Sequence, residues 1–233
     1  MNRELPAGAW QALLPRALVL IGEIRRHGGI TDPFWTLGGG TVLMFRHRHR
    51  LSKDIDIFVP NPQYLGFVTP RLSDVAASLT GDYSEDPSAW VKLQFEEGEV
   101  DFVAAPNLLD DAWEEWTIDG RRIRVETSAE IIAKKMFHRG HRTTARDLFD
   151  LALVIEREPD ALAAAADALV RHRSTFLDKS PSDIEDCVQG HRHAGLHARL
   201  RPLRRDSCGL PGSRPPTLVC STPRVHRTGA CFS

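Results

Sequence analysis

The segment Asp54–Val59, Asp-Ile-Asp-Ile-Phe-Val, constrains the fold of this 233-residue chain more than any other part of the sequence. In a strand, residues two apart face the same side, so Asp54 and Asp56 project together while Ile55 and Ile57 project to the opposite face. Two neighbouring carboxylates repel each other, and a hard divalent cation such as Mg²⁺ relieves that repulsion. The pattern predicts a strand with one buried and one acidic face; the competing interpretation of Asp-x-Asp alone is a solvated strand face.

A third acid, Asp101, lies between Val100 and Phe102 on a second alternating segment. An acid between core-type residues must point to solvent, a cation or a partner, because burying it alone is costly. If the two strands are neighbours, Asp54, Asp56 and Asp101 converge. Three convergent carboxylates could hold two Mg²⁺ ions, the arrangement that clamps the attacking and leaving oxygens in phosphoryl or nucleotidyl transfer.

Three consecutive glycines, Gly38-Gly39-Gly40, follow a predicted short strand at Phe34–Leu37 and precede a predicted helix that begins at Thr41. Such a turn exposes backbone N–H groups to a phosphate, and the helix dipole favours the anion. Thr41 adds a hydroxyl donor. No Gly-Lys-Ser/Thr follows, so this is not a Walker A loop, and a glycine run by itself is usually only a turn.

The remaining periodicities predict a mixed α/β (α+β) fold in which strands and short helices come first and helices come last. Further helices are expected at Trp10–His27, Arg71–Leu79, Ser128–His138, Thr143–Glu156 and Asp160–Arg173. Further strands are expected as two hairpins, Val91–Phe95 with Val100–Ala104 and Trp116–Ile118 with Arg121–Val125.

The composition changes abruptly near Asp186. Residues 187–233 contain eight arginines, one acid, five prolines, five glycines and all four cysteines of the chain. This tail carries a charge of +7, which leaves 22 basic and 30 acidic residues, or −8, in residues 1–186. It has few apolar residues and no helix or strand period, so we expect it to be irregular. A shifted reading frame in a GC-rich gene would produce this composition, and resequencing tests that hypothesis.

Charge and hydropathy narrow the class of protein. The net charge of −1 conceals the two unlike parts, so it says little against a nucleic-acid partner. The N-terminus, Met1–Pro15, lacks the apolar run of a signal peptide, and the longest apolar stretch, Ala17–Gly22, is too short to span a bilayer. A cytoplasmic protein without a membrane partner is expected.

Four separated motifs occur in a recognisable order. They are Gly39-Gly40-Thr41, Arg50-x-Ser52-x-Asp54-Ile55-Asp56, Ile132-Ala133-Lys134-Lys135-Met136 and Arg146-Asp147-Leu148-Phe149-Asp150-Leu151. Over Trp35–Ile155 the chain resembles the AbiEii/AbiGii toxin family of the DNA polymerase-β-like nucleotidyltransferase superfamily. The resemblance does not include the tail.

The resemblance implies a bilobed protein, with a nucleotidyltransferase sheet lobe at residues 1–126 and a helical lobe at residues 127–186. Members of the family are toxins of toxin–antitoxin and phage-defence systems. They transfer a nucleotide from an NTP, in some cases to a tRNA end. The family therefore implies an enzyme with an NTP substrate, Mg²⁺ and an antitoxin partner. It implies nucleotide and Mg²⁺ binding at Gly39, Gly40, Thr41, Asp54 and Asp56, with Arg50 and Ser52 in the same pattern.

The family also implies a phosphate contact from a helical lysine. Lys135 follows Ile132 and Ile131 by three and four residues and shares their inward face, so we favour it. Lys134 follows Glu130 by four, which predicts an exposed ion pair, and it is the second candidate.

Asp147 matches the Arg-Asp motif of the family and is expected to have the active role of the second lobe. Asp150, on the same helix face, is expected to tie the helix to a neighbour. The basic run Arg46–Arg50, which includes His47 and His49, is either a solvated loop or a phosphate or acceptor contact.

These residues predict a Mg²⁺-dependent nucleotidyltransferase. Asp54 and Asp56 would hold the metals, Asp101 would bind one metal and assist deprotonation of the acceptor hydroxyl, and Lys135 would neutralise the leaving pyrophosphate. Two alternatives stay open. Transfer to a protein or small-molecule hydroxyl is favoured by the −8 body, and the unusual tail is compatible with an inert relative that only binds a partner.

Overall fold

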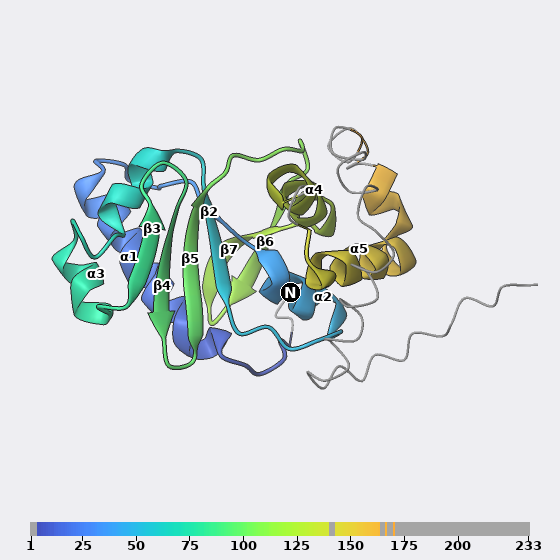
Figure 1. Cartoon of the computed structure of the whole chain (residues 1–233), viewed down its shortest axis with the longest axis horizontal. Helices are drawn as coiled ribbons and strands as arrows, with labels where there is room; N and C mark the ends of the chain where they lie inside the picture. Colours follow the sequence, from blue (N-terminus) through green and yellow to red (C-terminus); the bar gives the residue numbers. More distant parts are fainter. Residues whose placement is uncertain (1–3, 140–142, 164–165, 167–169, 171–233) are drawn as a thin grey trace, which may run out of the picture. The chain divides into compact units, whose positions relative to one another are not determined.

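The computed structural model describes residues 4–139, 143–163, 166 and 170 (Figure 1). All of them belong to one compact unit, residues 1–198. The predicted tail at 187–233 and much of the predicted helix Asp160–Arg173 lie outside the described residues. In the part of the chain that is described, no helix is both long and apolar enough to cross a membrane.

A seven-stranded mixed sheet organises the described unit. Its strands stand in the order β3-β4-β5-β2-β1-β7-β6. Their bounds are β1 Thr36–Gly38, β2 Ile55–Val59, β3 Tyr83–Asp86, β4 Trp90–Phe95, β5 Gly98–Ala104, β6 Trp113–Ile118 and β7 Arg121–Glu126. β2 is parallel to β5 and β1 is parallel to β7, whereas the other neighbouring pairs are antiparallel. The mixed α/β architecture expected from the sequence is confirmed.

At the centre of the sheet, the Asp-x-Asp strand, the strand that carries Asp101 and the glycine run are neighbours. Ile55, Ile57 and Val59 of β2 are buried, as their alternation predicts. On the neighbouring strands, Asp56 stands opposite Asp101 of β5 and opposite Gly38 of β1. Register alone therefore places two acids and the glycine turn side by side.

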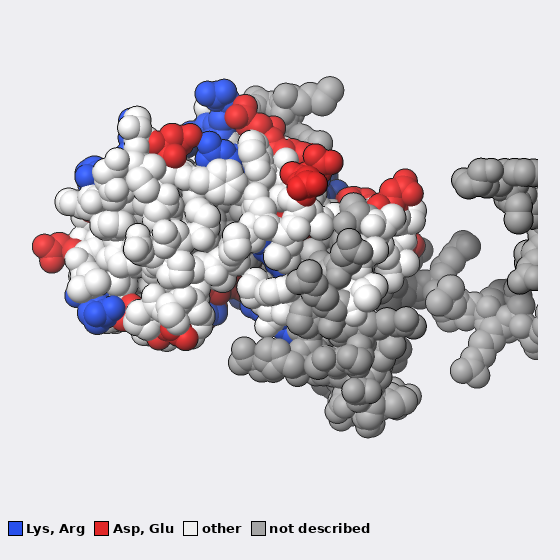
Figure 2. All heavy atoms as spheres, turned by 90° about the horizontal axis from the view of Figure 1, so that it is seen from above, with Lys and Arg blue, Asp and Glu red and all other residues white. Residues whose placement is uncertain are grey.

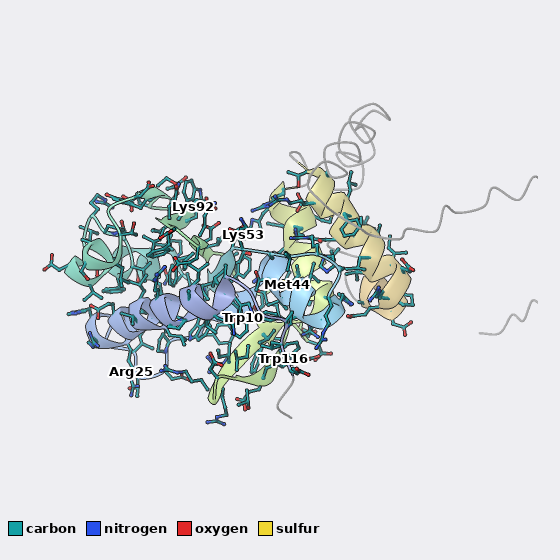
Figure 3. All side chains as sticks on the ribbon, turned by 90° about the horizontal axis from the view of Figure 1, so that it is seen from below. Trp10, Arg25, Met44, Lys53, Lys92 and Trp116 are labelled. Carbon is teal, nitrogen blue, oxygen red and sulfur yellow. The ribbon has the colours of Figure 1, made fainter. Side chains whose placement is uncertain are left out.

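Helices cover this sheet and close the region of the motifs. They are α1 Trp10–His27, α2 Gly39–His47, α3 Asp74–Leu79, α4 Ser128–Arg139 and α5 Ala145–Arg157, with a 3₁₀ helix, η1, at Pro62–Phe67. The apolar face of α1 packs on the central strands β2 and β5, as the view from below shows (Figure 3). Helices α2, α4 and α5 lie together on the β7 side of the sheet (Figure 1).

Two elements were not predicted, η1 and β3. The β3 sequence, Tyr-Ser-Glu-Asp, carries no apolar run, and this edge strand forms by pairing with β4. Helix α3 begins at Asp74 rather than at Arg71, because the Ser73 hydroxyl accepts a hydrogen bond from the Ala76 N–H and caps the helix there.

Candidate active site

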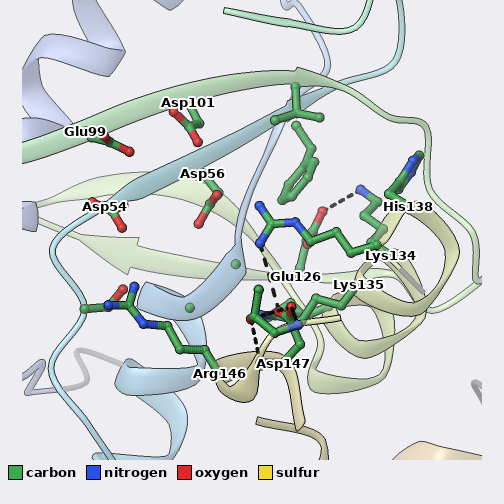
Figure 4. Close-up of a pocket in the computed structure, with 18 of the residues that line it drawn as sticks. Asp54, Asp56, Glu99, Asp101, Glu126, Lys134, Lys135, His138, Arg146 and Asp147 are labelled. Atoms are coloured by element: carbon green, nitrogen blue, oxygen red, sulfur yellow. Dashed lines mark hydrogen bonds and ion pairs between the residues drawn. The ribbon is translucent and has the colours of Figure 1, made fainter. Parts of the chain in front are cut away.

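A cavity of about 510 Å³ lies between the central strands and helices α4 and α5. Of the eleven residues predicted for the site, all but Thr41 line it: Gly39, Gly40, Arg50, Ser52, Asp54, Asp56, Asp101, Lys134, Lys135 and Asp147. Figure 4 shows the acids of β2 and β5 on the sheet side and the lysines of α4, with Arg146, on the helical side. The fold thus opposes carboxylates and cations across one cavity.

Asp56 and Asp101 are the two acids at the centre. Burial raises the pKa of Asp56 above its ordinary value. Burial, together with the charge of Asp56, raises the pKa of Asp101 to about 7. Oδ2 of Asp101 lies 3.2 Å from Nζ of Lys92, whereas Oδ1 is buried and has no hydrogen-bond partner among the described residues. Two half-buried carboxylates with one unpaired oxygen form an environment that favours a bound cation.

The acids of the cavity suit Mg²⁺ by the type of their ligand atoms, although they do not form a complete metal-binding group among the described residues. Asp54, Asp56 and Asp101 all line the cavity and offer the oxygen ligands that Mg²⁺ prefers. Within residues 4–139 and 143–163, however, no three His, Cys, Asp or Glu side chains form a group ready to hold a metal. The three acids therefore line one cavity, as predicted. One oxygen of Asp101 is paired with Lys92, so it does not join Asp54 and Asp56 in a shared metal-binding group.

The glycine turn is fitted closely to the acids. Gly39 has φ +69°, and a Cβ there would overlap the carboxylate of Asp56. A Cβ at Gly40 would lie 2.5 Å from Nη2 of Arg50 and 3.2 Å from Oγ of Ser52. Gly39 needs glycine because its φ is positive and its backbone passes directly against Asp56, whereas a Cβ at Gly40 would have to displace the end of Arg50.

Gly39→Ala is expected to displace the Asp56 carboxylate and to lower transfer activity about 100-fold. The positive φ and the overlap should also cost about 1–3 kcal/mol of unfolding free energy. Activity assays and chemical denaturation measure the two effects. Gly81→Ala is the matched control, since a Cβ there meets nothing within 4 Å. Equal behaviour of the two variants would contradict the close fit.

Thr41 is placed differently from the prediction. Its side chain is fully buried, and its hydroxyl donates a hydrogen bond to the backbone carbonyl of Asp54. The hydroxyl is thus engaged inside the protein and fixes the segment that carries Asp54. The sequence could not distinguish the two roles, because a threonine in the first turn of a helix suits either.

The two lysines of α4 have different surroundings. The Lys134 side chain is only 3% exposed; its Nζ lies 2.6 Å from Glu126 Oε1 and 3.3 Å from Glu130 Oε1, over the ring of Phe58. The predicted pair with Glu130 forms, but the prediction that it is exposed was wrong, because the end of β7 places Glu126 beneath the helix. Lys135 is 15% exposed, and its Nζ lies 2.7 Å from Asp147 Oδ1 and 3.1 Å from Asp150 Oδ2.

Asp147 caps helix α5. Its Oδ2 accepts the backbone N–H of Thr144 at 3.0 Å, the Thr144 hydroxyl accepts the Asp147 N–H, and Oδ1 accepts from Lys135. The capping bonds and the charge of Lys135 outweigh burial and lower the pKa of Asp147. Asp147 therefore reaches the cavity while it fixes the start of α5 and the position of Lys135.

Asp150 is fully buried and joins α5 to the basic run at Arg46–Arg50. It accepts from Nε and Nη2 of Arg50 at 3.1 and 3.0 Å and pairs with His49 Nε2 at 3.0 Å. Burial would raise the pKa of Asp150, but the bonds from His49 and Arg50 and the charge of Lys135 hold it below its usual range. The basic run is thus partly buried in ion pairs, rather than the solvated loop that was one of its two interpretations.

Glu126, at the end of β7, is a lining residue that the sequence reading missed. It is fully buried, and its Oε1 accepts from the Thr36 hydroxyl at 2.8 Å and from Lys134. Among the described residues its Oε2 has no partner. The sequence did contain a signal: Glu126 follows the alternating Ile123 and Val125 and precedes a helical lysine by eight residues. The same pattern is also typical of a strand that ends at the solvent-exposed surface.

Burial raises the pKa of Glu126 from 4.5 to about 6, despite the opposing effect of Lys134. The folded protein therefore binds this proton more tightly than the unfolded chain. The resulting stabilisation is complete below pH 4.5 and is lost as the pH rises through 6. Because of this proton, the unfolding free energy of the wild type should decrease by about 2 kcal/mol as the pH rises through this range, and Glu126→Gln should not show that decrease. Denaturation between pH 4 and 7 measures it; Glu115→Gln, on the exposed side of β6, should leave the decline unchanged.

The sequence profile described as "Nucleotidyl transferase AbiEii toxin, Type IV TA system" matches residues 29–207. The chain belongs to this AbiEii family. The match confirms the resemblance and extends beyond Trp35–Ile155 on both sides. It includes residues 187–207 of the tail, which the resemblance was expected to leave out. Membership makes the chain a relative of nucleotidyltransferase toxins, with the glycine turn and the Asp-x-Asp strand inside the matched region.

Three of the solved structures that match the chain share less than 20% of its sequence. ANT(2″)-Ia in complex with adenylyl-2″-tobramycin is 15% identical, with 67% of this chain and 98% of that chain covered and a TM-score of 0.44. MenT4, a nucleotidyltransferase toxin of Mycobacterium tuberculosis H37Rv, is 16% identical, with 81% and 92% covered and a TM-score of 0.35. The lincosamide antibiotic adenylyltransferase LnuA, lincomycin-bound, is 18% identical, with 58% and 92% covered and a TM-score of 0.38. No curated protein sequence matches the chain.

Proposed function

We propose that this AbiEii-family chain is a Mg²⁺-dependent enzyme that moves a nucleotide from an NTP to an acceptor hydroxyl. In this proposal it acts in the cytoplasm as the toxin of a toxin–antitoxin or phage-defence module, and an antitoxin holds it in check. The observation that carries the chemistry is the cavity in which the glycine turn, Asp54, Asp56 and Asp101 meet the cations of α4 and α5.

The reaction forms one bond and breaks one. The acceptor oxygen bonds to the α-phosphorus of the NTP, the bond from that phosphorus to the bridging oxygen breaks, and pyrophosphate leaves. Asp101 supports this step, because its buried Oδ1 has no hydrogen-bond partner among the described residues and would take the hydroxyl proton. The electron pair of the broken bond stays on the leaving oxygen, so the pyrophosphate takes up the negative charge.

Asp54, Asp56 and Asp101 would hold Mg²⁺, which when bound would neutralise charge on the phosphates. The chain itself would bind the triphosphate at the start of α2, where Gly39 and Gly40 line the cavity and carry no side chains. Close packing of Arg50 and Ser52 against Gly40 shapes this turn.

Lys135 is the proposed counter-charge for the leaving pyrophosphate. Its ammonium already pairs with Asp147 and Asp150, so a phosphate oxygen would replace one of these carboxylates. Lys134 is the less suitable candidate, since Glu126 and Glu130 enclose it. Asp147 would act on the reaction by orienting Lys135.

The acceptor is proposed to be RNA, with a tRNA end as the specific form. On the face drawn in Figure 2, acidic and basic groups both occur and most of the surface is uncharged, so the proposal relies on cations near the cavity to bind RNA. Exposed Arg146 and Arg139, both lining the cavity, are such cations.

Purified chain should be incubated with each α-labelled NTP and Mg²⁺, together with tRNA, total RNA, lysate protein or no acceptor. Label in tRNA supports the proposal, and EDTA should abolish it. Label in protein instead would favour the protein-hydroxyl alternative. Absence of transfer and of Mg²⁺-dependent NTP binding would favour the inert relative. Growth arrest on expression, relieved by a neighbouring gene, tests the toxin role.

A further inference from the structure

Lys92 is a cation of the sheet itself that lies beside the third acid of the site. It stands on β4 directly opposite Asp101 of β5 in the antiparallel register. Its Nζ is 3.2 Å from Asp101 Oδ2 and also pairs with Glu99 Oε2. All three residues line the cavity, and the Lys92 side chain is 30% exposed. No motif of the sequence pointed to this residue.

The contact makes the two oxygens of Asp101 unequal. Oδ2 is held by Lys92, whereas Oδ1 is buried and has no partner in the described part of the chain. A carboxylate held by one oxygen has little freedom to rotate, because turning it would break a charge-assisted hydrogen bond. The Lys92 contact therefore distinguishes a paired oxygen, Oδ2, from an unpaired one, Oδ1.

We propose that Lys92 is a positioning residue that holds Oδ2 of Asp101, so that the buried Oδ1 is the oxygen left unpaired for a divalent cation and for the acceptor hydroxyl. The inference rests on the proposed nucleotidyl transfer for its catalytic part only. Glu99 pairs with Lys92 and orients its ammonium group, and Lys92 in turn orients the carboxylate of Asp101.

The same geometry has an electrostatic consequence. The Lys92 charge lies against a carboxylate of the acidic group, so it repels any cation that Asp56 and Asp101 bind together. Removing that charge should tighten cation binding while it frees the Asp101 carboxylate to rotate. A residue that only supported the fold would not produce these two opposite effects.

The test compares the full-length wild type with Lys92→Met, Lys92→Arg and Lys53→Met. Lys53 is an exposed lysine and serves as the matched control; Figure 3 labels both lysines. Binding of Mn²⁺ without nucleotide is measured by electron paramagnetic resonance, and kcat and KM for the NTP are measured with Mg²⁺. Thermal melting is recorded for every variant, and Lys92→Gln replaces Lys92→Met if the latter does not fold.

For Lys92→Met we expect the Kd for Mn²⁺ to fall on the order of tenfold. We expect kcat to fall at least about tenfold, with KM unchanged. Lys92→Arg should restore both values, and Lys53→Met should match the wild type. An unchanged Kd, an unchanged kcat, or equal loss in the Met and Arg variants overturns the inference. If the wild type transfers no nucleotide, the proposed function fails, and the Mn²⁺ measurement alone decides whether Lys92 opposes cation binding.

Discussion

Replacing Asp56 by asparagine is expected to lower nucleotide transfer at least about 1000-fold, because it removes one charge and one ligand oxygen from the centre of the site. Asparagine has nearly the same shape, so the fit against Gly39 is kept. Burial raises the pKa of Asp56, which means that its ionised form is unfavourable in the folded protein. Asp56→Asn should therefore be as stable as the wild type or more stable.

Single-turnover transfer and chemical denaturation measure the two effects on the same preparation. Asp119→Asn is the matched control, because Asp119 is exposed in the β6–β7 turn with φ +48°, which asparagine tolerates. Transfer by Asp56→Asn within tenfold of the wild type would contradict the role of Asp56. A large loss of stability would contradict the inference that its charge is buried at a cost to the fold.

Asp150→Ala is expected to have the largest effect on stability. Arg50, His49 and Lys135 all converge on this buried carboxylate. Its removal leaves the buried Arg50 guanidinium without its carboxylate partner, whereas Lys135 keeps Asp147. Breaking a buried pair in this way costs about 3–5 kcal/mol of unfolding free energy. Activity should fall as well, since Asp150 holds Arg50 beside Gly40, where we propose that the triphosphate binds.

Denaturant unfolding of Asp150→Ala and of the exposed control Asp110→Ala gives the comparison. A double-mutant cycle with Arg50→Met then separates the Arg50–Asp150 coupling from the other losses. If Asp150→Ala loses less than about 1 kcal/mol, the buried ion-pair cluster does not hold α5 to the loop before β2.

Strands and turns with strong local patterns could be predicted from the sequence. The alternation at Ile55, Ile57 and Val59 specified the buried face of β2, and hence the face on which Asp54 and Asp56 lie. The three glycines marked the junction of β1 and α2, but α2 begins at Gly39, two residues before the predicted start at Thr41. The position of Asp101 opposite Asp56 followed only once β2 and β5 were neighbours.

Partners distant in sequence could not be predicted. Glu126 meets Thr36 across 90 residues, and Arg50 meets Asp150 across 100 residues. Helical spacing correctly paired Lys134 with Glu130 but could not show that both are buried, because their burial depends on β7 and the loop at Leu108 and Leu109. Lys92 became relevant through the β4–β5 register alone.

The central claim is that the cavity transfers the nucleotide part of an NTP. It is tested most directly with two preparations of the same NTP, one labelled at the α-phosphate and one at the γ-phosphate. Wild-type protein with Mg²⁺ should place only the α label in the acceptor and release the γ label as pyrophosphate, and Asp56→Asn should do neither. Appearance of the γ label in the acceptor, or undiminished α transfer by Asp56→Asn, would contradict nucleotidyl transfer at this site.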